Sequence, residues 1–241
     1  MHNGKMRIKV IFMLLLTVFI LLVIIITVNK KREKACAALG GAYNSGSVVI
    51  IDAGHGGMDG GATGVSGLLE KDCTLIISKK LDAAMAFLGI KTIMIRTEDM
   101  SLDYSEDNTI RKNKIADLKA RLKIADETEN PVFFSIHLNI FPESQYRGAQ
   151  VFYGPNSEKS AELADITQKT LISLLNDGNT RKYKKAPDSV YLMNKLSCPA
   201  VTIECGFVSN PEEEALLKNE GYQKKLAIAI AGGFIKYITG K

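Results

Sequence analysis

Apolar and polar residues follow two different periods along most of the chain. Short apolar, β-branched runs such as Val48–Asp52 predict buried strands, whereas segments with apolar residues three or four positions apart predict amphipathic helices. Glycine, proline and polar clusters separate these segments. The strands expected from this pattern span residues 48–52, 90–97, 131–139, 148–154, 189–194 and 199–205, and the helices span residues 70–89, 110–126, 157–175, a segment from 211, and 222–238.

The alternation of strands and helices predicts the fold class. It is typical of an α/β domain whose mostly parallel or mixed central sheet carries helices on both faces. Ser157 and Asn210 are the expected caps of the helices that follow them, and Pro211 suits a first helical position. A segment of about 190 residues is long enough for one such core. We therefore expect a single domain over residues 48–238, without repeats or a second domain.

The N-terminal region carries a long apolar run. Val10–Val28 contains nineteen residues without a charge, and a helix of that length spans ~28 Å, close to the thickness of the hydrocarbon core of a bilayer. We expect an N-terminal transmembrane helix within a membrane anchor at residues 1–34, followed by a small-residue linker at residues 35–47. A cleaved signal peptide is the alternative, although its apolar region usually has ~7–15 residues and the basic segment Lys30–Lys34 gives a poor cleavage context.

The distribution of charge argues against nucleic acid as a partner. The chain has a formal net charge of +5, but residues 1–34 hold seven of the 31 basic and one of the 26 acidic side chains. The remaining residues, with 24 basic and 25 acidic side chains, are nearly neutral. Nucleic-acid binding depends on a concentrated positive surface, which this part of the chain lacks.

Four cysteines, Cys36, Cys73, Cys198 and Cys205, lack the paired spacing of a zinc ribbon or a redox motif. Free and mostly buried thiols are the expected state of these cysteines. The sequence alone leaves a disulfide open.

Ionisable residues stand near the ends of three predicted strands. His55 follows the first strand, His137 lies near the end of the strand at 131–139, and Glu204 lies near the end of the strand at 199–205. Parallel strands of α/β folds bring such positions to one edge, where ligands bind. Imidazole nitrogens are common zinc ligands, and a catalytic zinc site keeps one further position open for water. The sequence "IIDAGHGGMDGGATG" around His55 removes most side chains from one side of that site.

The third zinc ligand could be Glu70, which begins the helix after the glycine-rich loop and can turn back toward His55. Its alternative role is that of a first-turn glutamate that favours the helix dipole. A phosphate-binding loop is the other interpretation of the glycines, but the Gly-Lys-Ser/Thr element of such loops is missing.

Several sequence blocks resemble the zinc-dependent N-acetylmuramoyl-L-alanine amidases, the Amidase_3 group. The resemblance implies that His55, Glu70 and His137 hold one zinc ion, that Glu204 is the catalytic carboxylate, and that the substrate is the amide between N-acetylmuramic acid and L-Ala in peptidoglycan. Many relatives have leucine at the position of Cys205. In order along the chain, the blocks are "IIDAGHGGMDGGATG", "LLEKD", "RTED", "ARLKIAD", "FSIHLN", "GAQVFY", "SAELA" and "PAVTIECGFVSNPEEEALL".

Three further features leave alternatives open. Asn139 either binds substrate or orients the site, or it is a turn residue at the end of a strand. Arg96 and Arg121 either bind substrate or pair with carboxylates inside the fold. The basic segment Thr180–Asp188 either faces an anionic glycan or is a solvated loop.

The compact layout resembles the sporulation members of the family, which act on spore cortex before muramic-δ-lactam forms and so support germination. The domain is then expected outside the cytoplasmic membrane of a bacterium. The alternatives are a general cell-wall turnover amidase, an inactive or partner-dependent peptidoglycan-binding module, and a zinc carboxypeptidase. The last is disfavoured because Met58 stands where the HxxE motif requires glutamate. Some members of the family carry an inserted helix that plugs the zinc site, but the segment between His137 and Glu204 leaves no room for such a helix. Zinc binding could therefore depend on an activating protein partner that closes the site.

Overall fold

The computed structural model describes residues 12–24, 26–27, 30 and 46–240. Residues 12–24 are helical and exposed, and residues 46–240 form an α/β domain. The helices of this domain are α2 (Glu70–Phe87), α3 (Ile110–Asp126), α4 (Glu158–Leu175), α5 (Pro211–Lys218) and α6 (Glu220–Thr239), and the strands are β1 (Val48–Ala53), β2 (Thr92–Met94), β3 (Pro131–Asn139), β4 (Gln150–Tyr153), β5 (Lys184–Lys185) and β6 (Ala200–Phe207).

A six-stranded mixed sheet forms the centre of the domain, in the order β2-β1-β3-β6-β4-β5. Strands β2, β1, β3 and β6 run parallel to one another, β4 runs antiparallel to β6, and β5 runs parallel to β4. The predicted α/β domain with a mostly parallel or mixed sheet is confirmed. The parallel part of the sheet places the carboxyl ends of β1, β3 and β6 side by side at one edge.

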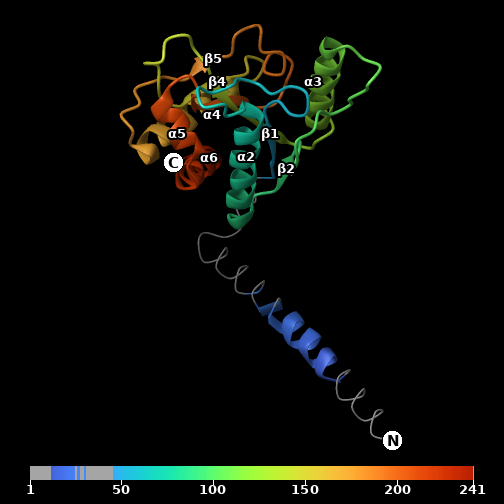
Figure 1. Ribbon diagram of the computed structural model, residues 1–241. Coiled ribbons are helices and arrows are strands. Elements are labelled where there is room, and N and C mark those ends of the chain that lie inside the picture. The colour runs from blue at the N-terminus through green and yellow to red at the C-terminus, as the bar shows by residue number, and fades with distance from the viewer. Residues whose placement is uncertain (1–11, 25, 28–29, 31–45, 241) are drawn as a thin grey trace, which may run out of the picture. The chain divides into compact units, whose positions relative to one another are not determined.

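Each face of the sheet has its own core, because successive side chains of a strand point to opposite faces. Ile50 and Phe133 belong to a buried cluster that also contains Ala125 of α3. The next residue of β3, Phe134, contacts Phe234 of α6 with ring centroids 5.9 Å apart. Helices α2 and α4 both pack against α6, and Figure 1 shows α3 apart from this group.

The expected strand at residues 189–194 is wrong, since this segment folds into turns. The side-chain amide of Asn194 donates to the carbonyl oxygens of Pro187 and Val190, each at 2.9 Å, and the backbone N–H of Asn194 also donates to Val190. These bonds close the turns and let Met193 reach the core without strand pairing. The apolar pattern therefore reports burial at this segment rather than strand geometry.

The edge strand β5 lies instead within the segment Thr180–Asp188, which we expected to be a loop. Its two lysines are exposed. Among the expected caps, Asn210 accepts hydrogen bonds from the backbone of α5, whereas Ser157 stands at the cap position of α4 without a side-chain capping bond.

The expected anchor at residues 1–34 and the linker at residues 35–47 lie largely outside the described residues, as does Cys36. Within the described ranges, no helix combines the length and the apolar character needed to cross a membrane. Cys73, Cys198 and Cys205 are free thiols, and the first and last of them are buried.

Candidate metal centre

The glycine-rich loop after β1 presents His55 at the edge of the sheet. His55 has a φ of 62°, a left-handed conformation that is uncommon for a residue other than glycine. Arg121 donates to its carbonyl oxygen at 2.7 Å, and Gly56 and Asp59 exchange two backbone hydrogen bonds just after it. These bonds hold the backbone of His55 in a conformation that the chain would otherwise seldom adopt.

Two glycines of the loop make room for the ionisable side chains. A Cβ atom on Gly54 would lie 2.6 Å from Nε2 of His137. A Cβ atom on Gly61, whose φ is 68°, would lie 2.6 Å from Oε2 of Glu70 and 2.7 Å from Cδ2 of His55. Any larger residue at either position would push these side chains out of place.

Glu70 turns back over the loop and joins the two histidines. Its Oε2 atom lies 3.2 Å from Nε2 of His55 and accepts a hydrogen bond from the backbone of Ala62 at 2.7 Å. Its Oε1 atom lies 2.9 Å from Nδ1 of His137 and accepts from the backbone of Leu138 at 2.9 Å. Glu70 is buried, so its role exceeds that of an exposed first-turn glutamate.

His55, Glu70 and His137 together form a candidate metal site. Each offers one ligand atom, and these three atoms all lie within 4.8 Å of one another. The rings of His55 and His137 meet edge to face, with centroids 4.9 Å apart. Two imidazoles and one carboxylate match the donors of a catalytic zinc site, which keeps a further position open for water or substrate.

Glu204 lies inside β6, directly opposite His137 in the register of β3 and β6. Its Oε2 atom is buried and has no hydrogen-bond partner. A buried carboxylate oxygen without a partner costs free energy, so its presence in a folded protein calls for an explanation such as a catalytic role. Because this oxygen is next to the candidate metal site, its lack of a partner is consistent with a reacting group.

The surroundings of Glu70 and Glu204 shift the pKa values of these two carboxyl groups in opposite directions. Burial alone would raise the pKa of Glu70, but hydrogen bonds and charge from His137 and His55 hold that pKa well below its ordinary range. Burial raises the pKa of Glu204 to about 7, and the Glu70 carboxylate adds to this effect while the histidines oppose it. Although burial favours the neutral imidazole, hydrogen bonds to Asp59 and Glu70 raise the pKa of His55 to about 9.

Arg121 and Arg96 support the site from inside the fold. Arg121 is buried, pairs with Asp52, and lies 2.7 Å from Asp117 through its Nε. Arg96, also buried, donates to the carbonyl oxygens of Ala53, Gly54, Glu98 and Lys71 at 2.7–3.1 Å. The structure thus favours an internal role for both arginines.

Two further acids, not singled out from the sequence, hold the loops around the site. The Glu213 carboxylate accepts from the backbone of Gly148 and of Phe207, each at 2.8 Å. The Glu214 carboxylate accepts from the backbone and the hydroxyl of Ser66 and from the backbone of Leu68. The only signal in the sequence was the run of glutamates at the start of the helix after Pro211.

Asn139 ends β3, two residues after His137, and the register of β3 with β6 is irregular between them. The Asn139 carbonyl oxygen accepts from the backbone of Val208 at 2.9 Å. Asn139 therefore lies at the same edge of the sheet as the metal site but is not a member of the ligand cluster.

Comparison with known families gives one match over nearly the whole domain. A family model described as N-acetylmuramoyl-L-alanine amidase matches residues 49–236. The chain is 37% identical over 197 residues to the germination-specific N-acetylmuramoyl-L-alanine amidase of Bacillus subtilis, and the match covers 82% of each chain.

Solved structures give the same result. The chain is similar to the CwlD amidase of Clostridioides difficile, solved in complex with the GerS lipoprotein, with a TM-score of 0.77 and 40% identity over 80% of this chain and 99% of the other. It is also similar to the amidase AmiC2 of Nostoc punctiforme, with a TM-score of 0.68 and 30% identity over 80% of this chain and 97% of the other.

Proposed function

The chain belongs to the N-acetylmuramoyl-L-alanine amidase family, and we propose that it performs this hydrolysis with one zinc ion held by His55, Glu70 and His137. The bond cleaved is the amide between the lactyl group of N-acetylmuramic acid and the L-Ala of the stem peptide. The observation that carries the proposal is the cluster of three ligand atoms within 4.8 Å, beside a buried carboxylate oxygen without a partner.

Zinc bound there would act as a Lewis acid that lowers the pKa of water and polarises the scissile carbonyl. Glu204 then has the role of the proton carrier. Its carboxylate accepts a proton from the attacking water and delivers that proton to the leaving nitrogen of L-Ala. A pKa near 7 suits a group that must both accept and donate a proton at neutral pH.

The remaining residues keep this arrangement in place. Arg121 fixes the backbone at His55, and the pair of backbone bonds to Glu70 fixes its carboxylate between the histidines. Asn139, at the end of β3, is proposed to contact the substrate from the same edge of the sheet.

The biological role proposed is spore cortex maturation, in which removal of stem peptides precedes muramic-δ-lactam formation and later germination. The germination-specific name of the B. subtilis relative supports this role. We further propose that residues 1–34 anchor the chain, that residues 35–47 are a linker, and that the catalytic domain at residues 48–238 lies outside the cytoplasmic membrane, where peptidoglycan is found. The uncharged run Val10–Val28 supports the anchor.

A protein partner is also proposed, by analogy with the C. difficile enzyme that was solved with a lipoprotein. One candidate ligand, His55, lies in a loop rich in glycine, so a partner that orders this loop would favour metal binding. A zinc titration of the chain without any partner tests this idea, and tight binding by the chain alone would contradict it.

The experiment that tests the proposed function uses purified peptidoglycan and the full chain. Stem peptides should be released, release should stop after treatment with a chelator, and added zinc should restore it. His137→Ala should neither retain zinc nor release peptides. Release by chelated, zinc-free protein would contradict the metal assignment, and a deletion strain with normal muramic-δ-lactam would contradict the sporulation role.

A further inference from the structure

We propose that Asp59 is a positioning residue that fixes the imidazole of His55 for metal binding. This inference rests on the proposed zinc function. The Oδ2 atom of Asp59 lies 3.0 Å from Nδ1 of His55, four residues earlier in the same loop. The other ring nitrogen, Nε2, faces Glu70 at 3.2 Å. The two nitrogens of one ring are thus divided between the candidate metal site and Asp59.

This division determines the tautomer of His55. A carboxylate only accepts hydrogen bonds, so Nδ1 of His55 must carry a proton in order to donate to Asp59. With the proton of the neutral ring on Nδ1, the lone pair is on Nε2, which is the nitrogen toward Glu70. Carboxylates behind metal-binding histidines commonly fix the ring and raise its basicity in this way.

Asp59 is itself held in place from three directions. Its backbone exchanges hydrogen bonds with Gly56 at 2.9 and 3.1 Å. Its Oδ1 atom accepts from the backbone of Gly61 at 3.3 Å, and its Oδ2 atom pairs with Nζ of Lys114 at 3.0 Å. An acceptor fixed by several bonds loses little conformational entropy when it orients the histidine.

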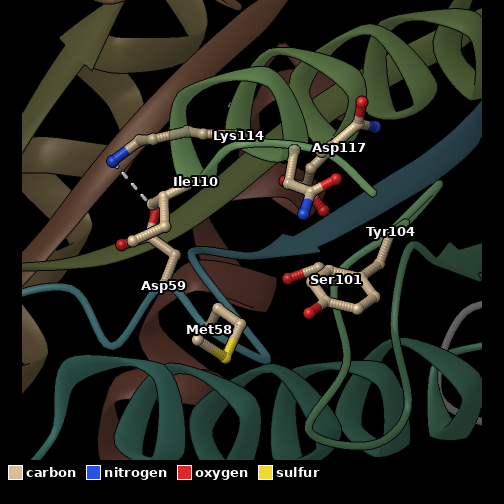
Figure 2. A pocket seen from close by; sticks show the side chains of 9 residues that line it. Met58, Asp59, Ser101, Tyr104, Ile110, Lys114 and Asp117 are labelled. Carbon is tan, nitrogen blue, oxygen red and sulfur yellow. Dashed lines mark ion pairs between the residues drawn. The ribbon is translucent and has the colours of Figure 1, made fainter. Parts of the chain in front are cut away.

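Lys114 comes from α3 and not from the loop, so the pair ties the loop to a helix. Figure 2 shows this pair, drawn as a dashed line, at the edge of a cavity of about 160 Å³ whose lining also includes Met58 and Tyr104. Asp59 therefore stands between this cavity and His55. The backbone strain at His55, with its φ of 62°, sets the direction of the Cα–Cβ bond, and Asp59 sets the remaining rotation of the ring.

Asp99 provides a matched control, because it braces the same loop without bonding to a candidate ligand. Its Oδ1 atom accepts from the backbone of Gly57 at 2.7 Å, and its Oδ2 atom pairs with Lys71 at 2.6 Å. A variant at this position removes an aspartate from the loop but leaves the acceptor of His55 in place.

The test measures the zinc dissociation constant of the full chain by competition with a chromophoric chelator, for wild type, Asp59→Ala, Asp59→Asn and Asp99→Ala. Asp59→Ala should raise the Kd by about 10–100-fold, the usual effect of losing a carboxylate behind a metal-binding histidine. Asp59→Asn should recover part of the loss, because its amide oxygen can still accept from Nδ1. Asp99→Ala should keep the wild-type Kd. Thermal unfolding of the metal-free proteins checks that each variant is folded.

Three results would overturn the inference. A wild-type Kd in Asp59→Ala would show that His55 needs no support from Asp59. An equal loss in Asp59→Asn and Asp59→Ala, or an equal loss in Asp99→Ala, would assign the effect to general order of the loop. If the wild-type chain itself bound no zinc, the proposed function would fail first, so the two failures are distinguishable.

Discussion

Replacing Glu204 with glutamine should lower activity and, at alkaline pH, stabilise the metal-free protein. Glutamine has nearly the same shape but cannot carry a proton between water and the leaving amine, so kcat should fall by about 10²–10⁴-fold. The stability effect follows from the burial of Oε2 without a partner. Such a site disfavours the charged form of the side chain.

The magnitude follows from the pKa of Glu204, which burial raises from its ordinary value of 4.5 to about 7. A folded-state pKa above the unfolded one gives stability that is present below pH 4.5 and lost as the pH rises through about 7. The full loss is at most ~3.5 kcal/mol, since each pKa unit corresponds to about 1.4 kcal/mol. Glutamine stays neutral, so the variant avoids this loss.

The assay is urea unfolding of wild type and Glu204→Gln with a chelator present, at pH 4 and at pH 8.5. The free energy of unfolding of the variant, relative to wild type, should rise by up to ~3.5 kcal/mol between the two pH values. Groups that titrate in both proteins, such as His55, contribute nearly equally to the two free energies of unfolding, so their contributions largely cancel in this comparison. A difference between the proteins that does not change with pH would refute the claim that Glu204 is an acid whose Oε2 atom is buried without a partner.

Three other predictions concern the surroundings of the site. Arg121→Met should lower the free energy of unfolding in urea by ~3–5 kcal/mol, because it leaves the buried Asp52 without its partner, and a loss below ~1 kcal/mol would contradict this role. Gly61→Ala should weaken zinc binding in a chelator competition, since the new Cβ would lie 2.6 Å from Oε2 of Glu70; an unchanged Kd would contradict the geometry. Although burial favours the neutral ring, hydrogen bonds to two carboxylates raise the pKa of His55 to about 9 in the metal-free protein, so zinc affinity should fall as the pH drops below 9 and calorimetry at pH 7.5 should detect proton release. Binding without proton release would count against His55 as a ligand.

Much of the fold follows from local patterns. The strand at 131–139 and the helix at 110–126 have the bounds that the sequence predicts, because each has a clear period and ends in polar or turn-forming residues. The segment at 189–194 has a similar apolar pattern but becomes turns. Its outcome depends on Asn194, whose side chain bonds back to the chain, and a pattern of hydrophobicity does not record such a bond.

The candidate ligands of the site were easier to predict from the sequence than the residues that hold those ligands in place. Glycines that clear space, and histidines at neighbouring strand ends, were visible in the sequence, and Glu70 was expected to turn back toward His55. Asp59 lies four residues after His55, but that spacing carries no signal outside a helix, and its role depends on the conformation of the loop. Arg121 could not be assigned without the burial of its partner Asp52, which is a tertiary property.

The most direct test of the central claim is mass spectrometry of peptidoglycan digested by the zinc-loaded chain in water enriched in ¹⁸O, with Glu204→Gln as control. The account predicts stem peptides with a free L-Ala amine and one ¹⁸O atom in the new carboxylate of N-acetylmuramic acid, with far less of both products in the control. Cleavage at another bond, or equal release by the control, would contradict it.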